Sequence, residues 1–218
     1  MQAAPTPLHE LPAWVDVTTM SVAGYFGAHL AARREVPLFG VLLAGLVLGL
    51  GGGIARDLLL GLEPAAISNW YYVPAVLAAA VIGGLLAYRV ELGNLPIVVV
   101  HTVAVGLLVT IGVQKAVAYR APGPSAILVG VVAATTGSAV DDVLANRRVT
   151  IMSEGPWLLG VITLGSVVFW LSTIYIGFYF AILAAVVPMV VVRVLSVRFG
   201  WTTPYFPGTG PHLQKGEP

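Results

Sequence analysis

The segment GLGGGIARDLLLG, at residues 49–61, combines glycines and charges inside a long apolar run. Its three consecutive glycines, Gly51, Gly52 and Gly53, would each weaken a helix by roughly 1 kcal/mol relative to alanine. They also carry no side chain, so another polar group can approach the backbone. Arg56 and Asp57 follow directly, and a charge in the middle of a membrane span costs about 2.5–3.5 kcal/mol. Such residues usually face the interior of a helix bundle or a water-filled cavity.

A second, degenerate copy of this segment, TTGSAVDDVLAN, lies at residues 135–146. It keeps Gly137 and Asp142, but Ser138 stands in place of a glycine and Asp141 in place of the arginine. Two interpretations of the glycines stay open. A broken helix would offer backbone carbonyl and amide groups to ions or polar solutes. An intact helix would instead use its glycines to pack closely against neighbouring helices.

Embedded charged side chains gather in four of the apolar runs, and the other three are nearly free of charge within their cores. The embedded charges are four acids and two bases, namely Asp16, Asp57, Asp141 and Asp142 against Arg56 and Lys115. Their net charge of minus two favours cations over anions. We expect a polar path through these four runs, and we expect a carboxylate to hold Arg56, because an unpaired buried guanidinium is costly. The alternative is that Arg56 forms a salt bridge with an aspartate of the other copy and has no further role.

The whole composition indicates that lipid surrounds the chain. Of its 218 residues 58% are hydrophobic and 10% are charged, whereas soluble domains average about 25% charged. Seven apolar runs of about 20 residues are long enough to cross a hydrocarbon core of ~30 Å. They lie near residues 13–32, 37–61, 71–88, 95–116, 125–146, 156–175 and 177–196. Because backbone groups in lipid must be satisfied internally, we expect seven transmembrane helices in an all-α integral membrane protein.

The composition also excludes several classes of function. A net charge of +1 gives no electrostatic footprint for nucleic acid. The absence of cysteine excludes disulfides, thiolate metal sites and cysteine nucleophiles, and we expect no metal or cofactor. Two aspartates on separate helices could resemble an aspartyl protease dyad, but the pattern of those enzymes is missing, so we expect no enzyme. The first residues lack the basic cluster of a secretory signal.

Basic residues are distributed unevenly between the two sides of the membrane. One side would hold eight of them, namely Arg33, Arg34, Arg89, Arg147, Arg148, Arg193, Arg198 and Lys215, while the other would hold Lys115 and Arg120. Since basic loops stay in the cytoplasm, we predict a multi-pass protein of the inner (plasma) membrane. Its N-terminus would lie outside and its C-terminus inside.

An internal repeat divides the chain. A shift of 85 residues aligns the chain with itself without gaps and superimposes Gly27 on Gly112, Pro37 on Pro122, Gly45 on Gly130, Gly52 on Gly137 and Asp57 on Asp142. We expect a single transmembrane domain, residues 1–218, with repeats at about 13–92 and 95–175, a seventh helix at about 177–196 and a disordered tail at about 201–218. Because each repeat would hold three helices, the second would enter the membrane inverted, as in many transporters.

A GGG-x-x-R-D segment in the second of seven helices, with a degenerate copy in the fifth, resembles the prokaryotic trimeric intracellular cation (TRIC) channels, also called a putative glycine transporter family. The resemblance covers residues 13 to about 196. The matching residues are Gly51, Gly52, Gly53, Arg56, Asp57, Gly137, Asp142 and Asn146. Ser138 and Asp141 depart from the family pattern. The resemblance implies a homotrimer with one pore per protomer, helices two and five kinked at their glycines, and passive conduction of monovalent cations, chiefly potassium.

Two transport functions therefore remain open at the level of sequence. The first is a passive potassium channel with membrane lipid and its own copies as partners. The second is a secondary transporter of a small zwitterion such as glycine, since inverted repeats with broken helices suit either. A purely structural membrane protein is a third interpretation. Electrophysiology separates the first two, because a channel gives unitary currents and a carrier gives slow, saturable flux.

Overall fold

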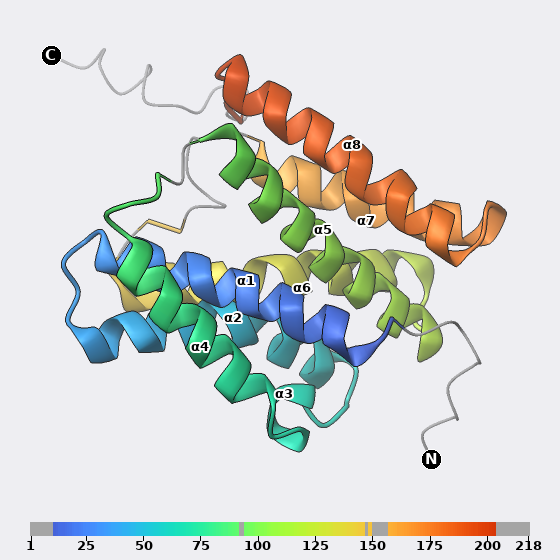
Figure 1. The fold of residues 1–218 in the computed structure, drawn as a ribbon. Coiled ribbons are helices and arrows are strands. Elements are labelled where there is room, and N and C mark those ends of the chain that lie inside the picture. The colour runs from blue at the N-terminus through green and yellow to red at the C-terminus, as the bar shows by residue number, and fades with distance from the viewer. Residues whose placement is uncertain (1–10, 92–93, 147, 150–156, 204–218) are drawn as a thin grey trace, which may run out of the picture.

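A computed structural model describes residues 11–91, 94–146, 148–149 and 157–203. All regular secondary structure in these ranges is helical, which confirms the all-α class (Figure 1). The helices are α1 (Ala13–Ala32), α2 (Leu38–Leu59), α3 (Ala65–Ser68), α4 (Tyr72–Leu86), α5 (Leu95–Ala118), α6 (Gly123–Leu144), α7 (Leu158–Tyr175) and α8 (Phe178–Arg198). Each of the seven predicted runs corresponds to one helix, and the short α3 was not predicted.

Five of these helices, α2, α5, α6, α7 and α8, are long and apolar enough to cross a membrane. The helix α4 is apolar but shorter, with 15 residues. The helix α1 has 20 residues, and its polar side chains, Asp16 and His29 among them, make it less apolar. Both polar side chains are buried against other helices, so α1 is polar on the side that faces protein. Such a helix suits the interior edge of a bundle rather than an isolated span.

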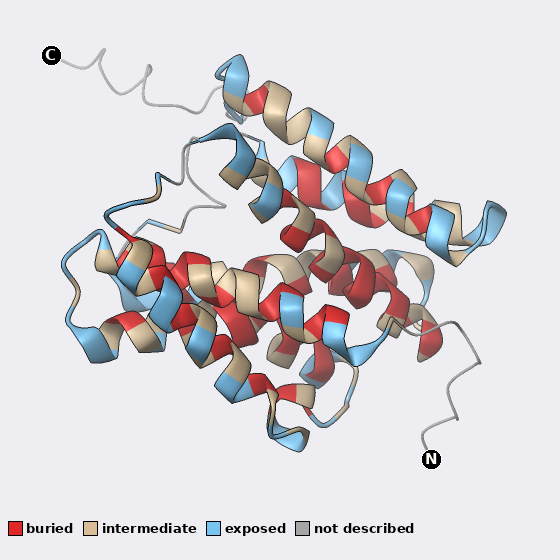
Figure 2. Cartoon of the chain, in the orientation of Figure 1, coloured by how far each residue is buried: buried red, intermediate tan, exposed pale blue. Residues whose placement is uncertain are grey.

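The helices form two groups that meet along α2, α5 and α6. In the first, α1 packs against α2 and α4; in the second, α7 and α8 pack against α5 and against each other. Figure 1 displays α7 and α8 on one side of the molecule and α4 on the other. Figure 2 shows buried positions concentrated on α5 and exposed ones on the outward surfaces of α4 and α8. Gly177, with a φ of 81°, forms the tight turn between α7 and α8.

The helices α2 and α6 cross at their glycines. A side chain on Gly52 would collide with the carbonyl oxygen of Ala133, and a Cβ on Gly137 would lie 2.5 Å from that of Leu48. Each contact is the repeat equivalent of the other. Gly52 corresponds to Gly137 and Leu48 to Ala133, because each pair is 85 residues apart. A contact that exchanges its members is what a two-fold axis produces. Since residue numbers increase on one helix as they decrease on the other, the two helices run antiparallel.

The glycine segments do not interrupt their helices. The helix α2 is continuous through residues 51–53, and α6 is continuous through Gly137. The structure therefore supports close helix packing, the second interpretation of these glycines, and not an opened backbone. A bend within either continuous helix stays a prediction.

Several sequence predictions fall on residues outside the described ranges. Arg147 and Lys215, which contribute to the predicted orientation, lie there, as does most of the predicted tail after residue 200. The remaining positions of that tail, residues 201–203, are described and are not helical.

Candidate functional site: a buried ion-pair cluster

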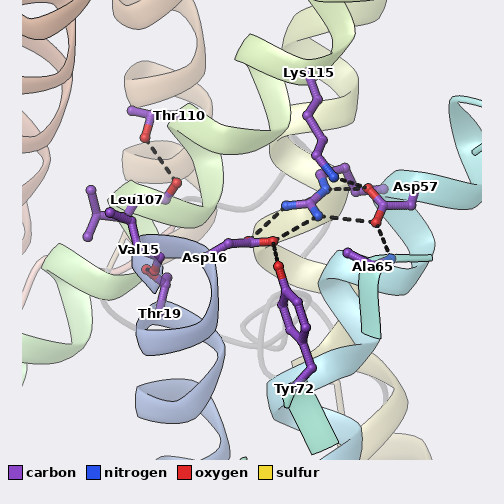
Figure 3. Close-up of polar contacts among 10 residues, drawn as sticks. Val15, Asp16, Thr19, Asp57, Ala65, Tyr72, Leu107, Thr110 and Lys115 are labelled. Carbon is purple, nitrogen blue, oxygen red and sulfur yellow. Dashed lines mark hydrogen bonds and ion pairs between the residues drawn. The ribbon is translucent and has the colours of Figure 1, made fainter. Parts of the chain in front are cut away.

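Arg56, in the last turns of α2, lies at the centre of a buried polar network. Figure 3 labels its partners Asp16 and Asp57. The Nε of Arg56 donates to Asp57 Oδ1 at 2.8 Å, and its Nη1 donates to Asp16 Oδ1 at 3.1 Å. The Nη2 group is 3.3 Å from Oδ2 of each aspartate. Because the side chain is fully buried, these carboxylates replace the water that the guanidinium would otherwise bind. The prediction that a carboxylate holds Arg56 is confirmed.

Three further groups bind the carboxylates of Asp16 and Asp57. Lys115 Nζ on α5 lies 3.0 Å from Asp57 Oδ1, and the backbone N–H of Ala65 donates to Asp57 Oδ2 at 3.0 Å. The Tyr72 hydroxyl donates to Asp16 Oδ2 at 3.1 Å. Five helices, α1 to α5, therefore converge on one set of contacts. We name Asp16, Arg56, Asp57, Tyr72 and Lys115 the ion-pair cluster.

The local sequence explains how α3 reaches this cluster. Leu59 ends α2, and Gly61 adopts a φ of 68°, in the left-handed region that reverses the chain. Pro64 then precedes α3, whose first N–H, that of Ala65, has no partner within the helix. That N–H donates to Asp57. The short helix thus supplies a backbone donor to a buried carboxylate.

The ion-pair cluster is electrically neutral, because its two acids match its two bases. Removing one member of a buried pair leaves an uncompensated charge and costs about 3–5 kcal/mol. Lys115 is the most accessible member, with 32% of its side chain exposed. A cavity of about 210 Å³ lies beside it, lined by Leu11, Ala13, Asp16, Tyr72, Ile111, Gln114 and Lys115. A small polar solute in this cavity would meet a carboxylate, a hydroxyl, an amide and an ammonium group.

The second pair of predicted charges lies at the other end of the α2–α6 crossing. Asp141 and Asp142 are buried in α6, at 4% and 5% exposure. Along antiparallel helices that rise about 1.5 Å per residue, they lie roughly 18 Å from Arg56 and Asp57. We call these two places the Asp141 end and the Arg56 end.

The alternative in which Arg56 pairs with an aspartate of the other copy is therefore wrong. Arg56 is held by Asp16 and Asp57, which belong to its own half of the chain. An ion pair does join the two halves, but it runs from Lys115 to Asp57. At the Asp141 end, the charge of Arg34 acts on Asp141. Helix direction explains the difference, because the antiparallel crossing carries the matched positions away from each other.

The other predicted site residues divide between packing and local bonding. Gly51 and Gly52 contact α6 at the crossing, and a side chain on Gly53 would collide with Met20 of α1. The hydroxyl of Ser138 donates to the Thr135 carbonyl of its own helix at 2.8 Å. Among the described residues, no group of three or more His, Cys, Asp or Glu side chains could hold a metal ion.

Tyr72, Gln114 and Ala65 were not singled out as site residues from the sequence. Tyr72 begins an apolar run in which an aromatic residue is typical of the membrane interface. Its partner, Asp16, lies 56 residues away, so only the fold brings the two together.

Comparisons with known proteins agree with this geometry. A family model described as "Glycine transporter" matches residues 13–91 and 98–174. The chain belongs to this family. The predicted resemblance to the prokaryotic TRIC channels is thereby confirmed, and the family's two matched segments begin 85 residues apart, at the spacing of the internal repeat.

Individual relatives give the same result. A UPF0126 membrane protein of Vibrio cholerae is 26% identical over 88% of this chain and 81% of its own length. The inner membrane protein YadS of Escherichia coli is 31% identical over 62% of this chain and 66% of its own length. Among solved structures, the TRIC trimeric intracellular cation channel orthologue of Rhodobacter sphaeroides superimposes with a TM-score of 0.78. It is 26% identical, and the match covers 87% of this chain and 98% of that chain.

A second TRIC cation channel structure, 21% identical, shares the fold with a TM-score of 0.77 over 89% of this chain and 96% of that chain. The relatives are named as membrane proteins, and the described helices are long and apolar. The chain is therefore an integral membrane protein, and its solved structural neighbours are cation channels rather than enzymes.

Proposed function

We propose that this protein is a passive channel for monovalent cations, chiefly potassium, with one conduction path in each protomer of a homotrimer. The observation that carries the proposal is the placement of buried charges at both ends of one antiparallel, glycine-lined crossing. Buried charges within membrane helices usually mark an ion path. The path follows α1, α2, α5 and α6. The Rhodobacter sphaeroides neighbour, a trimeric cation channel, supports the same function and assembly.

The proposed architecture is a single transmembrane domain of seven crossing helices. The helices α1, α2 and α4 form the first repeat, α5, α6 and α7 the inverted second repeat, and α8 is the additional crossing. The reciprocal contacts of Gly52 and Gly137 support this arrangement. A second pair of contacts also supports it: a Cβ on Gly27 would lie 2.6 Å from the Ala44 carbonyl oxygen, and one on Gly112 would lie 3.2 Å from that of Val129. These positions are again 85 residues apart.

The two ends have different tasks in this proposal. At the Asp141 end, two neighbouring carboxylates raise the local concentration of cations. At the Arg56 end, the neutral ion-pair cluster restricts the path, and its rearrangement opens it. At the crossing, the glycines let α2 and α6 pack closely with no side chain between them. Bends of α2 and α6 at these glycines would widen the path.

The proposed orientation places the Asp141 end and the C-terminus in the cytoplasm. The basic residues support it, since Arg33, Arg34 and Arg89 lie near that end. Single cysteines beside Arg89 and Arg120 can test it with an impermeant maleimide, because the native chain has no cysteine. We expect labelling in intact cells at residue 120 and not at residue 89. The reverse pattern would overturn this orientation.

A planar bilayer containing the purified protein in asymmetric KCl tests the channel function. We expect unitary currents whose reversal potential has the same sign as the equilibrium potential of potassium. A slow flux that saturates with solute concentration, without unitary currents, would contradict a channel.

A second function is favoured by the cavity beside the ion-pair cluster. Its walls carry both a carboxylate, Asp16, and an ammonium group, Lys115, which together complement a small zwitterion. The description of the family model, a glycine transporter, agrees with such a ligand. Uptake of labelled glycine into proteoliposomes separates the two functions. A carrier takes up glycine and passes no unitary current, whereas a channel gives the opposite result.

A further inference from the structure

Two histidines lie toward the Asp141 end: His29 on α1 and His101 on α5, two helices that pack against each other. His29 is fully buried, and neither of its ring nitrogens makes a hydrogen bond of ordinary geometry to the described residues, although the backbone of Val90 lies close to the ring. Its ring centroid lies 5.7 Å from that of Tyr25, and the His101 ring meets Phe26 edge-on at 4.7 Å. Buried polar groups without partners are rare, so His29 requires an explanation.

The 85-residue shift gives both histidines counterparts at the Arg56 end. Gln114 stands at the position equivalent to His29, and Asp16 at the position equivalent to His101. Both counterparts line the cavity beside the ion-pair cluster. The two ends are therefore built differently at matched positions, with polar groups around a cavity at one end and imidazole and aromatic rings packed together at the other.

We propose that His29 and His101 form a proton-sensitive closure of the Asp141 end of the path. This inference rests on the proposed function, because the current that it regulates is the proposed cation current. Neutral imidazoles can remain packed among apolar and aromatic side chains. A protonated imidazole there must gain water or an anionic partner, because an unpaired buried charge is costly. Acidification therefore hydrates this end, loosens α1 from its neighbours and adds positive charge beside the cation path. The added charge repels cations, so the potassium current falls at low pH.

Two arginines belong to the elements around the rings. Arg33 follows His29 by four residues, just after the end of α1, and Arg193 belongs to α8, which packs against α5. Other titratable groups on the helices at this end, or just beyond them, are Tyr25, Arg34, Glu35, Tyr88, Arg89, Glu91, Asp141 and Asp142. The two aspartates, on α6, carry the opposite sign. Like charges repel more strongly at a low dielectric constant. A protonated His29 beside Arg33 is therefore more stable once water lies between the two side chains.

The contact of α1 with the end of α4 is the part of the fold that this change would loosen. The Tyr88 hydroxyl donates to the Ala32 carbonyl at 3.2 Å, and Arg33 Nη2 donates to the Val90 carbonyl at 3.2 Å. Ala87, at the end of α4, is fully buried. A thiol at residue 87 would therefore report whether this contact opens.

The test compares two single-cysteine proteins in proteoliposomes. Ala87→Cys places the thiol at the buried position, and Arg89→Cys places it at an exposed one. Labelling by a small uncharged thiol reagent is measured at about pH 7.5 and about pH 4.5, on either side of the ordinary histidine pKa of about 6.5. The ratio of the two rates cancels the intrinsic pH dependence of the thiol. We expect this ratio to rise about tenfold on acidification, as histidine changes from largely neutral to largely charged.

His29→Gln is the matched control, because the chain itself places glutamine at the equivalent position, Gln114. We expect this variant to remove the rise in the labelling ratio. The double variant, His29→Gln with His101→Gln, should also keep its potassium current at low pH. An unchanged labelling ratio in the native background, or an equal rise in His29→Gln, would overturn the inference. A protein that labels as expected but passes no current at either pH would instead overturn the proposed channel function.

Discussion

The two ends of the α2–α6 crossing share a backbone arrangement and differ in charge. At the Arg56 end, two bases form ion pairs with two acids, and a tyrosine hydroxyl and a backbone N–H donate hydrogen bonds to the same carboxylates. At the Asp141 end, the equivalent positions of α6 carry two neighbouring carboxylates. Among the differences between the repeats, arginine at residue 56 and aspartate at residue 141 change the charge of the helix most: α2 carries an acid and a base, whereas α6 carries two acids. A duplicated helix can thus stabilise the fold in one copy and attract ions in the other.

The largest expected effect comes from breaking the neutral end. Arg56→Ala leaves Asp16 and Asp57 buried without their main partner, so we expect a loss of about 3–5 kcal/mol of stability and a low yield of folded protein. Thermal unfolding in detergent measures it. Asp141→Ala is the matched change at the other end, and we expect it to cost less. Equal losses at both ends would contradict the contrast between them.

A control separates charge from packing at the neutral end. Replacing a buried ion pair by apolar residues of similar size is often neutral, so Arg56→Met with Asp16→Leu should recover part of the stability lost in Arg56→Ala. No recovery would mean that Arg56 acts mainly through its contacts with Asp57.

The next effect tests the crossing that the two ends share. Gly52→Leu forces a side chain against the Ala133 carbonyl, and Gly137→Leu forces one against that of Leu48. We expect each to block current and to cost about 1–3 kcal/mol through overpacking. Gly51→Ala is the mild control, because its Cβ would lie 3.1 Å from the Gly137 Cα. Normal current in both leucine variants would remove the crossing from the path.

A smaller effect is expected at Lys115. Lys115→Met removes one partner of Asp57, but this side chain is partly exposed, so we expect about 0–1 kcal/mol of lost stability. The cluster would then carry a net negative charge, and the preference for potassium over chloride should rise. Unfolding midpoints and reversal potentials measure the two effects. A fall in cation preference would show that Lys115 does not face the path.

The sequence predicts much of this fold, because lipid imposes long apolar helices with few charges. The seven predicted runs match seven helices, and the repeat places Gly52 and Gly137 at equivalent positions of one crossing. The apolar runs also identify Asp16, Arg56, Asp57 and Lys115 as embedded charges. These features follow from composition and self-similarity, which a single sequence contains.

The partners within the site could not be predicted in the same way. Arg56 lies 40 residues from Asp16 and 58 residues separate Lys115 from Asp57, so the distances depend on how α1 and α5 pack. The four-residue α3 has no periodic signal, although it supplies the Ala65 amide. The sequence also left open whether the glycines break the helix or pack it closely, and only the contacts of a continuous α2 with α6 favour close packing.

The most direct test of the acidic end is the reversal potential of Asp141→Asn beside that of the native protein, in a tenfold KCl gradient. The native channel should approach the limit of about 59 mV for perfect cation selectivity at this gradient. Asp141→Asn keeps the shape of the side chain and removes its charge, so its reversal potential should move toward zero while its unfolding midpoint stays close to the native value. An unchanged reversal potential and unitary current would contradict the account, because Asp141 would then lie outside the path.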